Sequence, residues 1–547
     1  MSGRTAPAAV PPGRREREVA AGRWRDRMID GYVAEAAERR PDAPAVIDGD
    51  VTLTYAELER RVRATAASLQ DLGVVRGEAV SWQLPNWHEA CVLHHAVLRI
   101  GAVSNPIVPI YRRRELAYIL AEARSRVFVM PETFRGFSHV DMLAEIRGEL
   151  PLLEHVVPCR GGGSSFDDLC AGDRAPAPVD RTADDPMLLL FTSGTTARPK
   201  GAVHTHNTLD YENRSIIDVY GLTPSDVVFM PSPVSHITGL LYGLQLPAML
   251  GTAVVLQDVW EVQEGRRLID RHRCTFTVAA TPFLHDLTYR PDPGGLDVSS
   301  MRVFACGGAD VPPGLIRDAR ERLGCVASRL YGSTEFPTLS TTGPDDPPEK
   351  GAVTDGRAIG AAEFRVVDDG GRPVAAGEVG ELLVTGPELF LGYRRAEDDA
   401  DAFTPDGWFR TGDLAVRDAD GYLTIRGRKK DIILRGGENI SVTEVEALLF
   451  DHPRIAEIAV VAMPDPVMVE RGCAFVVPRP DAGPPLTLAD LAGYLIERGV
   501  AKQKIPERLE LVPGLPRTQS GKVQKFRLRD TVRAKLASEG VIAPADA

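Results

Sequence analysis

The chain contains 547 residues, 44% of them hydrophobic and 26% charged, which excludes wholesale disorder and corresponds to roughly three or four compact units. Its formal net charge of −12 opposes nonspecific binding to nucleic acid or to an anionic membrane surface. Seven cysteines are scattered without a CxxC pair, so neither zinc nor a disulfide framework is indicated, and a reducing, cytoplasmic setting is expected.

The first 27 residues carry seven arginines among proline, alanine and glycine, and no apolar run follows that would form the core of a signal peptide. We therefore predict a disordered tail over residues 1–27. A second segment, 229–257, lacks Asp, Glu, Lys and Arg, but three prolines interrupt it. It predicts a buried helix leading into a buried strand and not a transmembrane segment.

From residue 54 the chain alternates between helical and strand-like patterns. Thr54 and Glu57 form a capping box for a helix to about residue 72, and Asn86 and Glu89 repeat that signal for a helix ending near Gly101. The other predicted elements are strands at 79–84, 102–108, 127–130, 187–191, 275–280 and 301–306, and helices at 114–123, 262–273 and 314–323. This order predicts parallel sheets covered by helices.

Beyond about residue 430 the pattern changes to a compact α+β piece. Ser441 with Glu444, and Thr487 with Asp490, predict two helix starts, and strands are expected at 455–463 and 473–477. We predict an α/β fold in which a large N-terminal domain (28–429) of parallel α/β subdomains precedes a small C-terminal α+β domain (430–547).

The segment Phe191–Gly201, directly after a predicted buried strand, combines four hydroxyl residues, two glycines and one lysine. Glycines permit close approach of the backbone, hydroxyl and N–H groups donate to phosphate oxygens, and Lys200 supplies positive charge. The pattern GxxxxGK[ST] does not fit, so this is not a Walker A loop. Taken alone, a short polar segment of this kind is more often a surface turn.

Four further motifs follow this segment along the chain, and their order helps to interpret it. They are Tyr331-Gly-Ser-Thr-Glu335, Trp408-Phe-Arg-Thr-Gly-Asp413, Gly427-Arg-Lys-Lys-Asp431 and Pro516-Arg-Thr-Gln-Ser-Gly-Lys522. With the phosphate segment, these motifs resemble the signatures of the acyl-adenylate-forming, AMP-binding superfamily, in its acyl-CoA synthetase or acid–thiol ligase branch. The resemblance extends over nearly the whole chain after the predicted tail.

The resemblance implies a two-step reaction that uses ATP, Mg²⁺ and coenzyme A. A carboxylate first attacks the α-phosphate to give acyl-AMP and pyrophosphate, and a thiol then displaces AMP to form a thioester. A carboxylate is a poor electrophile, so it needs a leaving group before a thiol can attack. The family also implies that the C-terminal domain is mobile.

The resemblance assigns the nucleotide contacts residue by residue. Phosphates would be held by Thr192, Ser193, Gly194, Thr195, Thr196 and Lys200. Tyr331 would stack on adenine, with Gly307, Gly308 and Ala309 on its other side, although the two glycines could simply mark a tight turn. Gly332, Ser333 and Thr334 would lie at the α-phosphate, Glu335 would bind Mg²⁺, and Asp413 and Arg428 would contact the ribose or phosphate.

The catalytic residues implied by the family are Lys522, Glu335, Thr192 and His236. Lys522 would bridge the attacking carboxylate and the α-phosphate, where negative charge accumulates. Lys430 would be the hinge of the C-terminal domain, and Gly436, Gly437 and Glu438 would border the passage for the thiol. Ala197 replaces a glycine that is usual in the phosphate loop.

The acid substrate is predicted from the segment Pro233–Gly239, in which His236 would lie near the carboxylate. Val234, Ile237, Gly239 and Pro337 provide no buried cation, so an uncharged acyl tail is expected. Ile237 stands where siderophore-type aryl-acid ligases commonly have asparagine, and Tyr331–Pro337 is similar to cyclohexanecarboxylate-CoA ligases. We therefore favour an aliphatic or alicyclic acid.

Three functions remain open from sequence alone. They are an acid–CoA ligase, an aryl-acid or acyl-AMP ligase that loads a carrier protein, and a noncatalytic nucleotide-binding protein. Free CoA is favoured over a carrier protein, although residues 470–475 resemble aryl-acid ligases that use a carrier. No nucleic-acid partner or transmembrane segment is expected, and a homodimer is left open.

Overall fold

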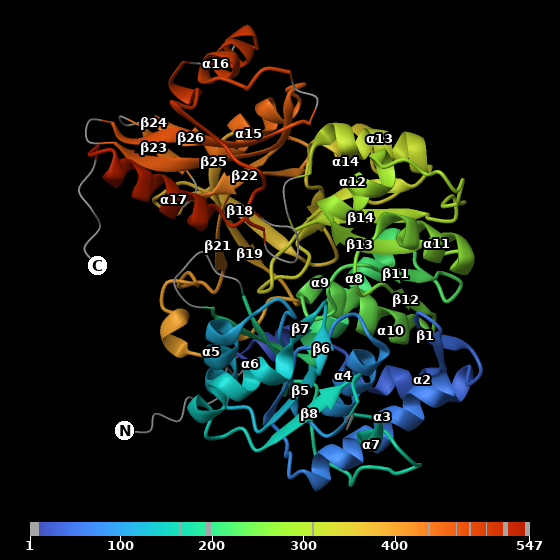
Figure 1. The fold of residues 1–547 in the computed structure, drawn as a ribbon. Helices are drawn as coiled ribbons and strands as arrows, with labels where there is room; N and C mark the ends of the chain where they lie inside the picture. Colours follow the sequence, from blue (N-terminus) through green and yellow to red (C-terminus); the bar gives the residue numbers. More distant parts are fainter. Residues whose placement is uncertain are drawn as a thin grey trace.

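The computed structural model describes residues 10–11, 13–162, 166–192, 199–308, 311–429, 432–435, 438–465, 468–480, 483–498, 500, 502–517 and 523–541. A large body is formed by the N-terminal part of the chain, and the C-terminal lobe, orange to red, lies across one end of it (Figure 1). None of the helices described is both long and apolar enough to cross a bilayer.

One sheet of the body is parallel at its centre and antiparallel at its edges. Its order is β17 (Arg357–Ala358), β16 (Ser340–Thr341), β15 (Val326–Tyr331), β14 (Val303–Gly307), β13 (Phe276–Ala280), β11 (Val228–Met230), β12 (Val254–Leu256), β1 (Pro44–Asp48) and β2 (Val51–Thr54). In register, β13, β14 and β15 align Ala280, Gly307 and Leu330. The ends of these three strands therefore meet at one edge.

The second sheet of the body is parallel except at one edge. Its order is β20 (Gly392–Tyr393), β10 (Gly201–Thr205), β9 (Pro186–Phe191), β4 (Val103–Pro106), β3 (Ala79–Trp82), β5 (Val127–Pro131) and β8 (His155–Cys159). The pairs β3–β4, β3–β5, β4–β9 and β5–β8 are parallel. Strand β10 runs antiparallel to β9, so the predicted phosphate segment lies between two paired strands.

Helices and a small hairpin accompany these sheets, and the predicted parallel α/β architecture is confirmed. The helices are α2 (Gly31–Arg39), α3 (Tyr55–Asp71), α4 (His88–Arg99), α5 (Arg113–Ala123), α6 (His139–Ile146), α7 (Phe166–Leu169), α8 (His206–Tyr220), α11 (Val262–His272), α12 (Thr281–Tyr289), α13 (Pro313–Leu323) and α14 (Pro348–Val353), and the hairpin is β6 (Thr133–Phe134) with β7 (Phe137–Ser138). Thr54 accepts a hydrogen bond from the Glu57 N–H, as its capping role requires.

The capping role predicted for Asn86 is wrong. Helix α4 has Trp87 at its N-cap and no side-chain cap. The Asn86 amide instead donates to the carbonyls of Met230, Ser232 and Gln257, and its oxygen accepts from the Val234 N–H. Asn86 is buried, so these bonds satisfy its polar atoms and join the two sheets.

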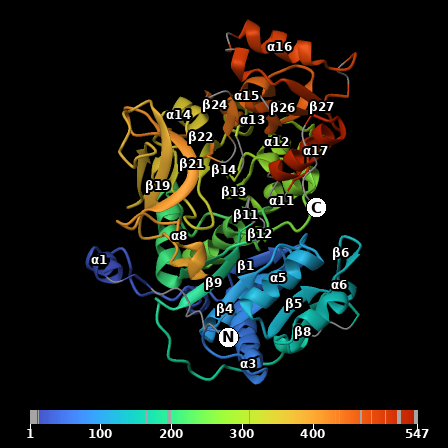
Figure 2. The same ribbon diagram turned by 90° about the vertical axis from the view of Figure 1, so that its left-hand side faces the viewer.

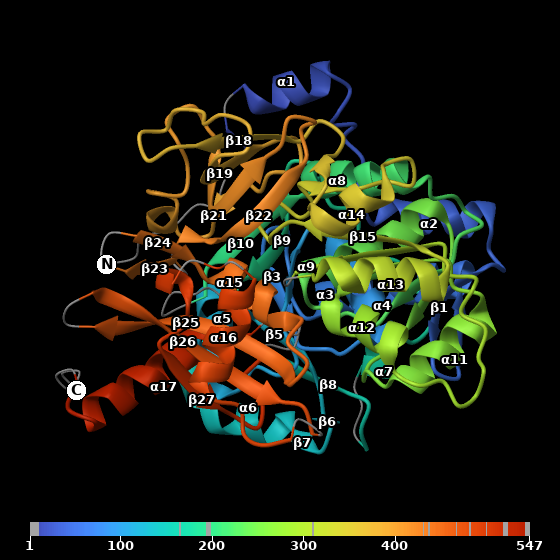
Figure 3. The ribbon, with the colours of Figure 1, turned by 90° about the horizontal axis from the view of Figure 1, so that it is seen from above.

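The disordered tail predicted over residues 1–27 is wrong for residues 13–27. Helix α1 (Arg14–Ala20) lies at the edge of the molecule in Figures 2 and 3. The buried Arg14 guanidinium donates to the carbonyls of Gly386, Pro387, Leu389 and Phe390. Trp24, 2% exposed, donates to the Pro387 carbonyl at 3.1 Å. These long-range hydrogen bonds stabilise the folded segment, although its composition alone predicts disorder.

The stretch 229–257 is buried, but it is more divided than predicted. Between β11 and β12 the chain forms α9 (Ile237–Gly239), a π-helix η2 (Leu240–Gln245) and α10 (Leu246–Leu250). A Cβ at position 239 would lie 2.1 Å from the Pro233 carbonyl oxygen, so only glycine fits there. π-Helical turns are frequent near functional sites.

A third, antiparallel sheet links the body to the C-terminal lobe. Its order is β18 (Glu363–Val367), β19 (Val379–Thr385), β21 (Phe409–Arg417) and β22 (Leu423–Arg428). The C-terminal lobe contains a sheet ordered β24 (Glu438–Ser441), β23 (Ile432–Arg435), β26 (Val469–Pro478) and β25 (Ile455–Asp465), with β27 (Arg508–Leu511) parallel to β26, and the helices α15 (Val442–Phe450), α16 (Leu488–Glu497) and α17 (Lys525–Ser538). The predicted α+β texture of the lobe is confirmed.

Candidate functional site

A cavity of about 770 Å³ opens where the ends of strands from the two body sheets meet strand β21 of the third sheet. It is lined by Phe191 at the end of β9, Ala280, Gly307 and Leu330 at the edge of the first sheet, and Thr411–Asp413 of β21. Gln524 of the C-terminal lobe also lines it. Ligands of α/β proteins bind beyond the carboxyl ends of parallel strands, and this cavity occupies that position.

The cavity brings together most of the predicted site residues that the structure describes. Lining it are Thr192, Lys200, His236, Gly307, Gly308, Gly332, Ser333, Thr334, Glu335, Asp413 and Arg428. Outside the described residues lie Ser193, Gly194, Thr195, Thr196, Ala197, Ala309, Lys430, Gly436, Gly437 and Lys522. Glu438 begins β24, where its backbone pairs with that of Arg435.

Glu335 and Lys200 are held by the same aromatic residue. The hydroxyl of Tyr393 donates to Oε1 of Glu335 at 2.7 Å. The Lys200 Nζ lies 4.7 Å from the centre of the Tyr393 ring and donates to the Asp398 carbonyl at 3.4 Å. The cavity therefore carries a cation and a carboxylate, each restrained by Tyr393.

Asp413 is fixed by donors from two other strands. The Arg428 Nε donates to Oδ1 of Asp413 at 3.1 Å, and the Tyr331 hydroxyl donates to Oδ2. Burial and the neighbouring Asp413 charge raise the pKa of Tyr331 well above its ordinary value, so the phenol remains a donor. The Tyr331 ring packs against an apolar cluster of the third sheet. Stacking of this ring on adenine stays a prediction.

Thr334 is positioned through its backbone by a buried histidine. Nε2 of His204 lies 2.8 Å from the Thr334 carbonyl oxygen. Burial lowers the pKa of His204 to about 4, so the ring is neutral at physiological pH and donates through Nε2. We call the region of Thr192, Lys200, Thr334, Glu335, Asp413 and Arg428 the polar end of the cavity.

A further part of the lining is built from the edge of the first sheet. Ala280 aligns with Gly307, Gly307 aligns with Leu330, and α9 packs against β13. We call the lining residues Ile237, Val278, Ala279, Ala280 and Leu330 the apolar end of the cavity. Of the predicted acyl-pocket residues, Ile237 and Pro337 line the cavity, whereas Val234 is a fully buried core residue.

The two glycines at this edge are required for different reasons. A Cβ on Gly307 would lie 2.4 Å from the Leu330 carbonyl oxygen, so the neighbouring strand excludes a side chain. Gly308 has open space beside it but a φ of +79°, which L-residues rarely adopt. Gly308 is a turn glycine, as the alternative reading of the sequence allowed, whereas Gly307 is a close-packing glycine.

Comparison with known proteins decides the family. Residues 33–394 match the model of the AMP-binding enzyme, and residues 444–522 match that of the AMP-binding enzyme C-terminal domain. The chain belongs to the AMP-binding enzyme family. It is an AMP-forming acid–thiol ligase, as the ordered motifs predicted.

Relatives of this AMP-binding enzyme differ in their acids and acceptors. A medium-chain fatty-acid–CoA ligase of Escherichia coli (strain K12) is 36% identical and covers 95% of this chain and 93% of its own. A salicyl-AMP ligase/salicyl-S-ArCP synthetase of Mycobacterium tuberculosis (strain ATCC 25618 / H37Rv) is also 36% identical, over 92% and 91%. The crystal structure of anthranilate CoA ligase AuaEII in complex with anthranoyl-AMP superimposes with a TM-score of 0.85 at 27% identity, covering 94% and 98%.

Several lining residues of this AMP-binding enzyme were missed by sequence reasoning. They are Tyr393, Glu397, Asp398, Asp401, Lys429 and Gln524. Lys429 lies inside a quoted motif and Gln524 lies two positions beyond Lys522, so motif proximity could have found both. Tyr393 follows the apolar run Leu389–Leu391, and nothing in that local pattern points to a polar site.

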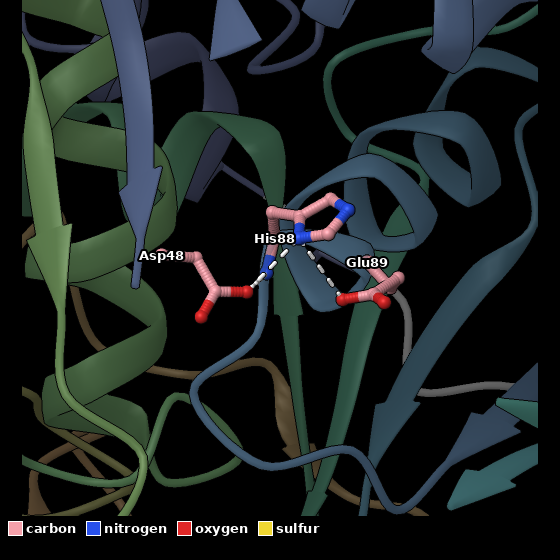
Figure 4. Close-up of side chains that lie close together, drawn as sticks. All are labelled: Asp48, His88 and Glu89. Atoms are coloured by element: carbon pink, nitrogen blue, oxygen red, sulfur yellow. Dashed lines mark hydrogen bonds and ion pairs between the residues drawn. The ribbon is translucent and has the colours of Figure 1, made fainter. Parts of the chain in front are cut away.

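A second cluster, formed by Asp48, His88 and Glu89, has the spacing of a metal site (Figure 4). The His88 Nδ1 lies 2.9 Å from Asp48 and 3.3 Å from Glu89. The Arg160 guanidinium pairs with both carboxylates and lies 4.2 Å from the Trp87 ring centre. Burial opposes ionisation of Asp48, but His88 and Arg160 still hold its pKa below the usual value. This cluster is a compensated ion-pair network that joins β1 to α4.

Proposed function

We propose that this enzyme activates an uncharged aliphatic or alicyclic carboxylic acid with MgATP and transfers the acyl group to free CoA. The observation that carries this proposal is the single cavity with a polar and an apolar end. Phosphates and ribose need hydrogen-bond donors and acceptors, whereas a hydrocarbon tail gains free energy from leaving water. The polar end therefore suits the AMP part of an acyl adenylate, and the apolar end suits its acyl tail.

The nucleotide contacts follow from the chemistry of the polar end. Lys200 and Thr192 would hold phosphate oxygens beyond the α-phosphate, and Thr334 would contact the α-phosphate. Each carboxylate oxygen of Asp413 has more than one acceptor site, so the bonds from Tyr331 and Arg428 leave capacity for ribose hydroxyls. Tyr331 would stack on adenine, with Gly307, Gly308 and Ala309 opposite.

Glu335 fits Mg²⁺ because it presents a hard carboxylate oxygen to the cavity that Lys200 lines. When bound there, the ion would supply positive charge against the phosphates. Lys522 would place its ammonium between the acid and the α-phosphate, because two anions must approach each other in that step. His236 at the start of α9 would orient the acid's carboxylate.

Thioester formation is assigned to the C-terminal lobe. We propose that this domain begins near residue 430 and turns about Lys430, so that Gly436, Gly437 and Glu438 border the path of the thiol. Gln524 already lines the cavity in the present arrangement. The lobe is therefore close enough to the polar end to take part in the first step.

The chemical nature of the acyl tail is proposed from the residues of the apolar end. Its five side chains carry no charge, and Ile237 and Ala280 offer no hydrogen-bond donor to a ring hydroxyl. An aryl acid loaded onto a carrier protein is the second candidate, which the similarity to the Mycobacterium tuberculosis ligase favours.

Pyrophosphate exchange with a panel of acids tests the proposal. We expect exchange with medium-chain and cyclohexanecarboxylic acids, at least tenfold above salicylate and 2,3-dihydroxybenzoate, and a CoA thioester detectable by mass. A preference for the hydroxybenzoates with transfer only to a carrier protein would establish the second candidate. ATP binding without exchange for any acid would show a noncatalytic nucleotide-binding protein.

A further inference from the structure

Tyr393 occupies a restrained position between the two charged groups of the polar end. In β20 it pairs with Ala202 of β10, two residues after Lys200. Its N–H donates to Oδ1 of Asp399 at 2.8 Å, and its ring packs edge-on against Phe390 with 5.0 Å between centres. The residue is only 6% exposed. Its side chain therefore has little freedom to move away from the cavity wall.

Both the hydroxyl and the ring of Tyr393 make contacts with charged groups. The hydroxyl donates to Glu335, and the ring lies under the Lys200 ammonium. An ammonium over an aromatic face is stabilised by the ring quadrupole.

The consequence is a separation of opposite charges. Among the residues that the structure describes, Lys200 and Glu335 line one cavity without forming an ion pair with each other. A direct pair would neutralise both groups, leaving neither the cation for phosphate nor the carboxylate for a metal ion. A phenol avoids this, because it satisfies a carboxylate through its hydroxyl and a cation through its ring.

We propose that Tyr393 is a positioning residue that keeps Lys200 and Glu335 apart and presents them to different parts of MgATP. This inference rests on the proposed use of the cavity for ATP. The Tyr393 hydroxyl, which bonds Glu335, should therefore affect the dependence of activity on Mg²⁺. The Tyr393 ring, which contacts Lys200, should affect binding of the nucleotide itself.

Two substitutions separate these assignments. Tyr393→Phe keeps the ring and removes the hydroxyl. We expect the Mg²⁺ concentration for half-maximal pyrophosphate exchange to rise about tenfold, as for loss of a hydrogen bond to a charged group. The Kd of metal-free ATP, measured by calorimetry, should change less than twofold. Tyr393→Leu removes both contacts, so it should also weaken metal-free ATP binding by about three- to tenfold.

A coupling test and a control exclude a merely structural role. If the hydroxyl acts through Glu335, Tyr393→Phe added to Glu335→Gln should not weaken MgATP binding further. Tyr220→Phe removes another buried hydroxyl, bonded to Ser328 and Thr341 outside the cavity, and should leave the metal dependence unchanged.

The outcomes distinguish this inference from the proposed function. A wild-type enzyme without acid-dependent exchange refutes the proposed function. An active wild type whose Tyr393→Phe and Tyr393→Leu variants both keep wild-type Mg²⁺ dependence and ATP affinity refutes the inference alone. Additive effects with Glu335→Gln, or equal effects of Tyr220→Phe, would also overturn it.

Discussion

The two ends of the cavity are built by different means. At the polar end, hydrogen-bond donors and an aromatic ring from several strands hold Asp413, Glu335 and Lys200. Glu335 and Lys200 keep their charges for a ligand, because they do not pair with each other. At the apolar end, the shape is set by the register of β13, β14 and β15 and by the close approach of Gly307 to Leu330. Electrostatic partners therefore define one end, and backbone packing defines the other.

A buried carboxyl group behind the cavity lining extends the comparison. Glu212 accepts hydrogen bonds from Tyr242 and from the Thr338 N–H, next to the lining residue Pro337. Burial raises the pKa of Glu212 to about 7. Burial thus pushes the carboxyl group behind the lining toward its neutral form, whereas the lining of the polar end carries paired charges.

The largest effect is expected from Lys522→Ala, because a preorganised charge at the reacting centre typically contributes 10²–10³-fold in rate. Acid-dependent pyrophosphate exchange should fall by about that factor, while thioester formation from synthetic acyl-AMP should fall much less. Lys535→Ala, on α17 and paired with Glu510, is the control and should change neither rate more than twofold. Equal losses in both half-reactions would reject the assignment.

The second largest effect is expected from Asp413→Ala, at the polar end. It removes the acceptor of Arg428 and Tyr331 and the proposed ribose contact. We expect the KM for ATP to rise about 10- to 100-fold, from loss of charge-assisted hydrogen bonds, with the KM for the acid within threefold. If the KM for the acid rises instead, Asp413 does not contact the nucleotide.

Gly307→Ala tests the packing of the apolar end. The added Cβ must displace the Leu330 carbonyl, so we expect a loss of about 1–3 kcal/mol in the free energy of unfolding. Because Gly307 also borders the proposed adenine site, the KM for ATP should rise together with the KM for the acid. Gly314→Ala, on α13 with open space around its Cβ position, should instead be neutral or stabilising. Equal losses for the two variants would argue against the close-packing role of Gly307.

The smallest effect concerns pH. Because the folded pKa of Glu212 lies above its unfolded value of 4.5, its contribution to stability is fully present below pH 4.5 and is lost as the pH rises toward about 7. Glu212→Gln removes this titration. The melting temperature of the variant relative to wild type should therefore increase between pH 5 and pH 8. A constant difference would contradict the raised pKa.

The sequence could predict the polar end better than the apolar end. Lys200, Glu335 and Asp413 stand in contiguous motifs that carry the family resemblance, and the structure gathers them in one cavity. Gly307 could be noticed, but its closeness to Leu330 depends on which strand pairs with β14. Tyr393 shows the same limit, since its partner Glu335 is 58 positions away.

The N-terminal segment was mispredicted for a related reason. Composition favoured disorder, but Arg14 donates to carbonyls more than 370 positions away, at Gly386 to Phe390. Phe390 in turn donates through its N–H to the Glu335 carbonyl. A segment that lacks a local reason to fold is ordered here by long-range hydrogen bonds beside the polar end.

A crystal structure with a sulfamoyl analogue of cyclohexanecarbonyl- or octanoyl-adenylate tests the central claim most directly. We expect the ribose on Asp413, the sulfamoyl group beside Thr334 and the acyl tail against Val278, Ala279 and Ala280. An analogue bound with its ribose away from Asp413, or with its tail outside the apolar end, would contradict it.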